Sequence, residues 1–356
     1  MNSKKDVQII SHTVNDLKRG SLEHLHDPYN YLKYEHCKRC TFLTNPYHKN
    51  DDTLNHVAVV DDKVIGKVDY IRIEQRPGNL EFYWLSDFIV HQDYRDSAAG
   101  FKLLISSLSM GKRLAVSGAS EVAYKLYKKF KWRDYSLNRY ILLLKSENIV
   151  NNLLKYKYSI YISSKIINYV IKNVIKIRIK NTKTFGHYEV LTVTKLEADL
   201  RRCELSYVDS SEINYYSWLA QSKFSSDPRN SNQLVGVYDV NGKLISFFLM
   251  KNRFHERIRE SSISNIVISS LAGLRLVSPD ACIKDVLFSA VDLAKTRDSD
   301  LFEFCPLPGE EQKLNLKIPF LQRGKHKILS NHVRSSENDI LESMQFRQLS
   351  GDAFFS

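Results

Sequence analysis

The chain has 356 residues, a hydrophobic fraction of 43% and a formal net charge of +12 at pH 7. This length predicts two domains, because single hydrophobic cores stop growing at about 250–300 residues. The polar start MNSKKDVQ leads into no apolar segment and no run of eighteen uncharged apolar residues occurs, so we expect neither a secretory signal nor a membrane span. Five scattered cysteines favour a reducing, cytoplasmic setting.

The first part of the chain holds one possible metal motif and a predicted hairpin. His36, Cys37 and Cys40 form an H-C-x-x-C group, but no second pair of ligands accompanies it. We interpret this group as part of a helix face with a buried thiol and expect no metal. Residues 56–71 form two apolar runs around a turn at Asp61-Asp62-Lys63, which predicts a hairpin.

The segment 82–104 carries the strongest functional signal. An apolar run ends at Val90, and five residues later the small-residue loop Arg95–Gly100 leads directly into an amphipathic helix over 100–110. Small side chains leave backbone N–H groups accessible at a helix N-terminus, where the helix dipole also favours an anion. The guanidinium of Arg95 can add a charge-assisted hydrogen bond. The segment therefore predicts a loop that binds a diphosphate.

Residues 113–144 predict three further elements that follow this helix. We expect a short apolar strand over Leu114–Val116, a polar turn over Ser117–Ser120, a helix over Glu121–Phe130 and a strand over Arg139–Leu144.

This order of elements, together with two motifs, resembles the GNAT superfamily of N-acetyltransferases. The family loop R/Q-x-x-G-x-G/A matches Arg95, Ala98 and Gly100, with Ala98 in place of the first glycine. The family segment A-x-x-L-Y-x-K-x-G-F matches Ala123, Leu126, Tyr127, Lys129 and Trp132, with Lys131 where glycine is usual. The resemblance covers roughly residues 50–145 and implies a fold that uses acyl-CoA, with an acetyl or short hydroxyacyl group.

The resemblance also implies how acyl-CoA is bound. In the family, the strand before the phosphate loop diverges from its neighbour and contacts the pantetheine arm through its backbone. The N–H of Val90 is then the implied donor to the oxyanion of the tetrahedral intermediate. The implied cofactor-binding residues are Phe88, Ile89, Val90, Arg95, Asp96, Ser97, Ala98, Ala99, Gly100, Ser117 and Ser120.

Two side chains are candidates for proton transfer. Tyr127 matches the family tyrosine that protonates the departing thiolate, and the alternative is a tyrosine that only packs on the sheet. Asp87 lies two residues from Ile89, so strand alternation places both side chains on one face. We predict Asp87 as the general base. The alternatives are a structural aspartate at a bulge, with His91 or a water relay as the base.

A basic segment separates the two halves of the chain. Between Asn148 and Tyr188 there are eight Lys and Arg residues and no Asp or Glu, and apolar residues recur at helical spacing. We predict a partly helical linker over 151–188. Its lysines either lie in water, or residues 153–183 make weak contact with an anionic membrane surface or a phosphate-bearing substrate. No recognition motif accompanies the charge, so we expect no nucleic acid as a partner.

The second half repeats the element order of the first. Residues 234–250 predict a hairpin with Asn241-Gly242 in a type I′ turn, followed by a strand over 263–269. A helix over 279–296, with Ser278 as N-cap and Pro279 in the first turn, and a strand over 301–305 complete the repeat. The segment SLAGLRLVS at 270–278 carries bulky side chains, so we expect no phosphate loop in this copy.

The predicted fold class is therefore α+β, with two tandem GNAT-like domains. Each is expected to be a mixed, mostly antiparallel sheet flanked by helices. The predicted bounds are 1–150 for the domain with the acyl-CoA site, 151–188 for the linker and 189–356 for the divergent copy.

A looser resemblance indicates the acceptor. The tandem arrangement, FLTNPY at 42–47 and the terminal LSGDAFF are similar to bacterial acyltransferases of surface-polysaccharide gene clusters, which act on nucleotide-linked (dTDP-type) deoxy-aminosugars. Tyr83 and Trp84 are predicted to stack on such a substrate, with a place in the core as the alternative. Three other functions stay open: an aminoacyl-tRNA-dependent peptidoglycan-bridge transferase, a protein or peptide N-acetyltransferase, and a GNAT-like binding protein without catalysis.

Overall fold

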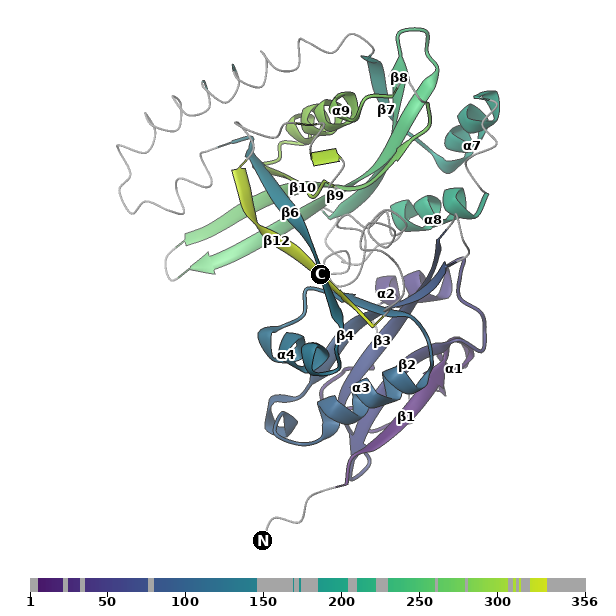
Figure 1. The fold of residues 1–356 in the computed structure, drawn as a ribbon, viewed down its shortest axis with the longest axis vertical. Coiled ribbons are helices and arrows are strands. Elements are labelled where there is room, and N and C mark those ends of the chain that lie inside the picture. Colours follow the sequence, from purple (N-terminus) through teal and green to yellow (C-terminus); the bar gives the residue numbers. More distant parts are fainter. Residues whose placement is uncertain are drawn as a thin grey trace. The chain divides into compact units, whose positions relative to one another are not determined.

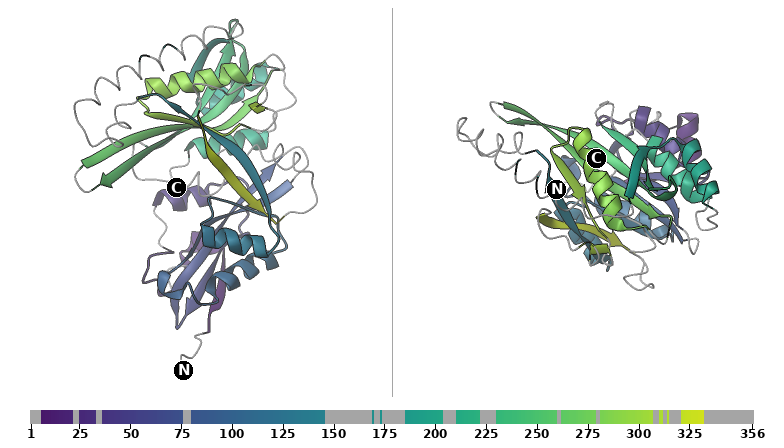
Figure 2. Two further views of the ribbon diagram at one scale, coloured as in Figure 1. Left: turned by 60° about the vertical axis from the view of Figure 1, so that its left-hand side comes forward. Right: turned by 90° about the horizontal axis from the view of Figure 1, so that it is seen from above.

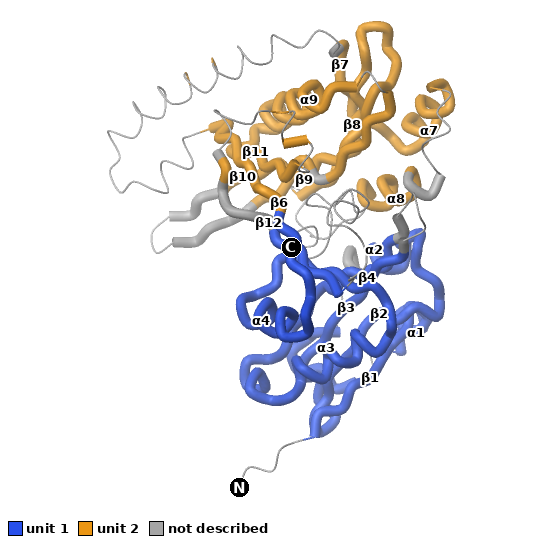
Figure 3. Tube along the Cα trace, in the orientation of Figure 1, with its two compact units in different colours: residues 1–136, 327–344, 350–356 blue, residues 137–326, 345–349 orange. Residues whose placement is uncertain are grey.

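The structure is a computed structural model whose contacts divide the chain into two compact units (Figure 3). Unit 1 consists of residues 1–136, 327–344 and 350–356, and unit 2 of residues 137–326 and 345–349. The described residues are 6–21, 25–32, 36–75, 80–145, 169, 173, 185–203, 210–221, 230–259, 262–278, 281–306, 310, 311, 314 and 321–331. Most of the predicted linker, and its possible membrane surface at 153–183, lie outside them.

Unit 1 is a sheet in the order β1-β2-β3-β4-β5-β12, with helices on both faces (Figures 1 and 2). Its elements are β1 (Gln8–Thr13), α1 (Val14–Arg19), α2 (His36–Leu43), β2 (Thr53–Val60), β3 (Lys63–Gln75), β4 (Leu80–Val90), the 3₁₀ turn η2 (Gln92–Tyr94), α3 (Ala99–Ser109), β5 (Leu114–Ser117) and α4 (Glu121–Lys129). Alternation along β2 explains the two faces, because Ala58 and Val60 pack in the cluster that holds α3, whereas Val57 and Val59 pack with Leu32.

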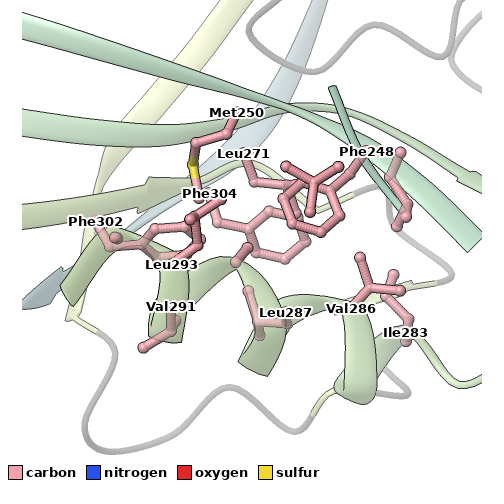
Figure 4. Packing of buried hydrophobic residues seen from close by; sticks show 14 of the residues in the cluster. Phe248, Met250, Leu271, Ile283, Val286, Leu287, Val291, Leu293, Phe302 and Phe304 are labelled. Carbon is pink, nitrogen blue, oxygen red and sulfur yellow. The ribbon is translucent and has the colours of Figure 1, made fainter. Parts of the chain in front are cut away.

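Unit 2 holds the strands that follow in the same strand order, β6-β11-β10-β9-β8-β7. Its elements are β6 (Arg133–Leu143), β7 (Phe185–Val190), α7 (Val193–Arg202), α8 (Ser210–Gln221), β8 (Ser231–Asp239), β9 (Leu244–Arg259), β10 (Ser262–Leu276), α9 (Ile283–Thr296) and β11 (Leu301–Phe304). The strand β12 (Leu321–Ser330) belongs to unit 1 from Lys327 onward. The side chains of Phe248, Met250 and Phe304 pack against α9 in a buried apolar cluster (Figure 4). Phe247, on the opposite face, contacts the ring of Tyr216 from α8 at 5.0 Å.

Each unit contains a strand from the other half of the sequence. The end of β12 pairs with β5 through Ile328–Ser117 and Leu329–Val116, and Leu329 is buried in the unit 1 core. In return, β6 pairs with β11 in unit 2, where Tyr140 and Leu142 join the core beneath α9. The strand predicted over 139–144 therefore exists, but it packs with the second half of the sequence. For this reason the observed unit 1 ends its first segment at residue 136 rather than at the predicted 150.

Two local predictions need correction. A type I′ turn requires positive φ at both central residues. In the β2–β3 hairpin Asp61 and Asp62 meet this requirement, with φ of +48° and +61°. In the β8–β9 hairpin only Gly242 has positive φ, so Asn241-Gly242 does not form the predicted type I′ turn. There the Gly242 N–H donates to the Asp239 carbonyl, which makes a longer turn. The helix predicted over 279–296, with Ser278 as N-cap and Pro279 in the first turn, begins at Ile283, with Cys282 as its N-cap residue. Among the described residues, no helix is long and apolar enough to cross a membrane.

The C-terminus of α4 explains why glycine is usual at the position of Lys131. Lys131 has φ of +60°, in the left-handed region. Its N–H donates to the Lys128 carbonyl and the N–H of Trp132 donates to the Tyr127 carbonyl, which together form a Schellman motif. The motif thus forms despite the lysine, at the cost of an unfavourable backbone conformation for a residue with a Cβ.

Replacing Lys131 with glycine should stabilise the protein by about 1 kcal/mol, because glycine adopts the left-handed conformation without a Cβ clash. Urea denaturation measures this as a higher midpoint. Lys129→Gly, two residues earlier on the same exposed helix end, is the matched control and should lower the midpoint. A Lys131→Gly variant no more stable than the parent would contradict the strain at this position.

Candidate active site

The main feature of unit 1 is the divergence of β4 from β5. These parallel strands pair at Tyr83–Leu114 and Trp84–Ala115, and among the described residues their register ends there. Beyond this point β4 stays with β3, while β5 pairs on its other side with β12. The edge of β4 that faces β5 is therefore open from residue 85 onward. This is the divergence that the resemblance implies.

A β-bulge lies in the open part of β4. Asp69 pairs with Ser86 and Lys67 with Ile89, so Asp87 and Phe88 together oppose a single residue of β3. Asp87 has φ of +49°, so its backbone is left-handed. The bulge interrupts the alternation of side chains along β4. Asp87 and Ile89 therefore cannot be assigned to one face only because they are two residues apart. The carboxylate nevertheless reaches the face of Ile89, because it lies 3.5 Å from the ammonium of Lys67, the partner of Ile89 in the register.

Beyond the bulge, β4 is held so that Val90 turns its backbone toward the open edge. The N–H of His91 donates to the Ile65 carbonyl of β3 at 2.8 Å. Successive residues of a strand point their N–H groups to opposite edges, so the N–H of Val90 points away from β3. Gly66 makes this close approach possible, because a Cβ there would lie 2.6 Å from the Ile89 carbonyl oxygen.

The predicted diphosphate loop follows directly. Ser97 Oγ accepts from the Ala99 N–H at 3.2 Å, and the Ala98 carbonyl accepts the first helical hydrogen bond of α3 from Lys102 at 2.8 Å. The N–H groups of the first turn precede that bond and have no partner within the helix. Gly100 leaves room there, because a Cβ would meet only a Val90 methyl, at 3.8 Å. The side chains of Arg95, Asp96, Ser97 and Ala98 are exposed.

Tyr127 is fully buried beside the bulged segment of β4. Its ring lies 6.0 Å from that of Phe88 and 4.6 Å from that of Trp132. Ser120 is the N-cap residue of α4, and its Oγ accepts from the Ala123 N–H at 3.3 Å. Ser117, at the end of β5, is buried, whereas Ser120 is exposed. The structure therefore brings Tyr127 next to the open strand, in a packed environment.

Lys67 is a site residue that the sequence prediction missed. Its ammonium is buried, with 5% side-chain exposure, and bonds to Asp69 at 2.7 Å and to Asp87 at 3.5 Å. Asp69 is completely buried, whereas 37% of the Asp87 side chain is exposed. The signal was the segment V-I-G-K-V-D at 64–69, where a lysine and an aspartate alternate with apolar residues and a glycine breaks the strand pattern. Asp87 is thus a partly accessible carboxylate with a fixed cationic neighbour.

His91, the alternative base, has a different set of contacts. Its ring stacks on that of Tyr29 at 3.7 Å, and its Nδ1 accepts from the Asp93 N–H at 3.4 Å. It therefore caps the 3₁₀ turn that leads into the phosphate loop.

Tyr83 and Trp84, the predicted stacking residues, lie in the core, with 2% and 0% exposure. The Tyr83 hydroxyl donates to Asp52 at 3.1 Å, and Asp52 also accepts two bonds from Arg72. Burial and the neighbouring Asp52 carboxylate raise the pKa of Tyr83. Burial opposes ionisation of Asp52, but hydrogen bonds from the Lys49 N–H and from Arg72 outweigh it and lower its pKa. Neither ring presents a face to a ligand, so their placement gives the predicted substrate role no support.

Unit 2 has a similar bulge but a different helix start. The register of β10 on β9 shifts between Leu271 and Gly273, at the place that corresponds to Asp87. Here α9 begins with the buried side chains of Ile283 and Asp285, and a carboxylate at a helix N-terminus opposes a bound phosphate. Among the residues that the structure describes, no three His, Cys, Asp or Glu side chains gather as a metal site requires.

The comparisons show the fold. No family model matches the chain, and no curated protein matches its sequence. Saccharomyces cerevisiae N-myristoyltransferase with bound myristoyl-CoA matches with a TM-score of 0.55 and 13% identity, over 95% of this chain and 81% of that one. An Enterococcus faecalis protein described as a probable N-acyltransferase matches with 0.50 and 8%, over 95% and 75%. A GCN5-related glucosamine N-acetyltransferase region of a fungal β-N-acetylglucosaminidase matches with 0.51 and 14%, over 92% of this chain and 38% of that one.

At these identities the likeness extends to the fold alone. The prediction of an α+β fold with two tandem GNAT-like domains is confirmed.

Proposed function

We propose that this protein is an N-acyltransferase that takes its acyl group from acyl-CoA bound to unit 1. The observation that carries the proposal is the open edge of β4, which ends at the uncapped N-terminus of α3. The extended pantetheine arm can pair with that edge, while the diphosphate accepts hydrogen bonds from the N–H groups in the first turn of the helix. The edge and the helix start are joined by only the short segment from His91 to Ala98.

The residues divide between two parts of the donor. Backbone groups of Phe88, Ile89 and Val90 bind the pantetheine arm, and the loop from Arg95 to Gly100 binds the diphosphate, with Arg95 as its flexible cation. Ser117 and Ser120 flank the arm on the β5 side. In the described part of unit 2 no helix begins in a comparable way, so we propose one donor site per chain.

The reaction requires two proton transfers and stabilisation of the negative charge on the tetrahedral intermediate. The acceptor nitrogen attacks the thioester carbonyl, and the Val90 N–H at the open edge stabilises the oxyanion. Collapse of this intermediate breaks the carbon–sulfur bond, and the Tyr127 hydroxyl gives its proton to the thiolate. Asp87, directly or through a water, takes the proton that the nitrogen loses. The ammonium of Lys67, 3.5 Å from the Asp87 carboxylate, holds that carboxylate in place.

For the acceptor we propose the amino group of a nucleotide-linked deoxy-aminosugar of the dTDP type. The resemblance to polysaccharide-cluster enzymes and the sugar-directed fungal match support this class. A protein or peptide amine such as that of lysine is the second candidate, because the N-myristoyltransferase match extends over nearly the whole chain. Assay of the enzyme with both amines decides which of them is the acceptor.

The donor site is tested by replacing Gly100 with aspartate. The new carboxylate would lie at the N-terminus of α3 against the diphosphate, so the Kd for coenzyme A should rise at least tenfold, about 1.4 kcal/mol. Isothermal titration measures it. Val240→Asp, at a position 71% exposed in unit 2, is the control of equal charge and should bind as the parent does. A folded Gly100→Asp protein with unchanged affinity would refute the loop assignment.

The acid is tested by Tyr127→Phe. A tyrosine that only protonates the leaving thiolate acts in the transition state, so kcat should fall about 100-fold with little change in KM. Coenzyme A affinity and the urea midpoint, measured alongside, exclude loss of donor binding or of the fold. Full kcat in the phenylalanine variant would mean that Tyr127 is a packing residue.

The base is tested by the pH profile of Asp87→Asn. With a sugar amine as acceptor, the variant should lose activity mainly on the acidic limb and recover at alkaline pH, where the free amine forms without help. With a peptide lysine the loss should persist over the accessible range, because that amine stays protonated to a far higher pH. An unchanged profile would assign the base to water or His91.

A further inference from the structure

Exposed apolar side chains gather on the helices α3 and α4 of unit 1. Phe101 and Ile105 of α3 are 51% and 40% exposed, and Val122 of α4 is 81% exposed. Both helices pack in the same buried cluster, through side chains such as Leu103 and Tyr127, so they cover one face of the unit 1 sheet (Figure 1). Their outer sides therefore present large apolar side chains to water.

The outer sides of the two helices meet at Phe130. Phe101 and Ile105 are one turn apart on α3 and share a face. The ring of Phe101 lies 5.7 Å from that of Phe130, the C-cap residue of α4. The exposed residues Val122 and Lys129 are two turns apart on α4, so the outer stripe of this helix ends beside Phe130.

Two lysines flank Phe130 in the sequence. The side chains of Lys129 and Lys131 are both exposed. Among the residues that the structure describes, no carboxylate pairs with either of them. The aromatic ring therefore lies between two ammonium groups that are available to an external anion.

The charge on the α4 side of this surface is not balanced by carboxylates. Residues 121–133 carry five Lys and Arg residues and one Glu, which pairs with a lysine of α4. The next carboxylate in the chain, that of Asp134, accepts a hydrogen bond from a tyrosine hydroxyl. Residues 93–102 carry two acidic and two basic side chains, so the α3 side is neutral and the whole surface is positive.

Lys131 occupies a position where glycine would be more stable. Its φ of +60° lies in the left-handed region, which is unfavourable for a residue with a Cβ. A lysine there lowers the stability of the fold and places a cation beside Phe130. Strained positions of this kind are often retained because the side chain serves binding.

An aromatic ring between unpaired lysines matches the chemistry of an anionic membrane surface. Phenylalanine and aliphatic side chains bury at the boundary between headgroups and acyl chains, while lysines attract anionic headgroups. The aliphatic stems of lysine let the ammonium stay among the phosphates while a neighbouring ring inserts. A nucleic acid would neutralise the lysines but would leave Ile105 and Val122 exposed to water, so a lipid surface is favoured.

We propose that Phe101, Ile105, Phe130, Lys129 and Lys131 dock unit 1 on the surface of an anionic phospholipid bilayer. This docking goes beyond acyl transfer and does not depend on it. If the proposed function holds, docking brings the donor loop to the membrane, because Phe101 directly follows Gly100, and only this consequence rests on that function.

The test is sedimentation of the full chain with vesicles of phosphatidylcholine alone and of phosphatidylcholine mixed with phosphatidylglycerol. The parent should bind only the anionic vesicles, and binding should weaken as the salt concentration rises. Lys129→Gln should weaken binding about fivefold, which corresponds to about 1 kcal/mol for one cation at an anionic surface. Lys284→Gln, at an exposed position of α9, removes the same charge and should bind as the parent does.

Two further variants assign the contact to this surface. Phe101→Ser should weaken vesicle binding at least fivefold, because the inserted ring is lost. Val240→Ser, at a position 71% exposed in unit 2, is its control. Lys131→Gly should also bind about fivefold more weakly although its urea midpoint rises, and this opposite change in stability and binding excludes unfolding as the cause.

The proposal is overturned if the parent does not bind anionic vesicles, or if none of the three variants weakens binding. It is also overturned if the lysine variants bind more weakly but Phe101→Ser does not, because charge attraction alone would then explain the binding. Tighter binding to double-stranded DNA than to anionic vesicles would identify a nucleic acid as the partner instead. None of these measurements uses coenzyme A, so a failure of the acyl-transfer proposal remains distinguishable.

Discussion

The divergence of β4 from β5 is the constraint on which the site in unit 1 depends. A strand edge that opens inside a sheet exposes N–H and C=O groups, and three features keep it open without unfolding the sheet. The bulge at Asp87 and Phe88 bends β4, Gly66 lets its far end press against β3, and β12 satisfies the other edge of β5. Since β12 comes from the last part of the chain, the opening in the first domain is completed by the second half of the sequence.

Much of unit 1 was predictable because its signals are local. Apolar runs, the small-residue loop and the Asp61–Asp62 turn fixed hairpin, helix and strand positions to within a few residues. Lys131 shows that a departure from a family motif need not change geometry, since the left-handed position is retained. The exchange of β6 and β12 was not predictable, because strand pairing between residues such as Ile328 and Ser117 leaves no mark in local periodicity.

The candidate site was predicted unevenly for the same reason. Backbone-based features, namely the residues before and within the loop, follow from sequence order along one strand and one helix. Side-chain environments do not: Tyr83 and Trp84 are buried by contacts with segments distant in sequence, such as Asp52. Lys67 escaped notice because its importance lies in its pairing across to Asp87, which only the bulged register creates. The two units thus use one fold differently, with an open helix start in unit 1 and buried side chains at the start of α9 in unit 2.

Hydrogen–deuterium exchange of the full chain with and without coenzyme A tests the central claim most directly. We expect slower amide exchange at residues 88–101, where the open β4 edge meets the first turn of α3, and no change at residues 269–285 of unit 2. Absence of protection at 88–101 in the presence of saturating coenzyme A, or protection confined to unit 2, would contradict it.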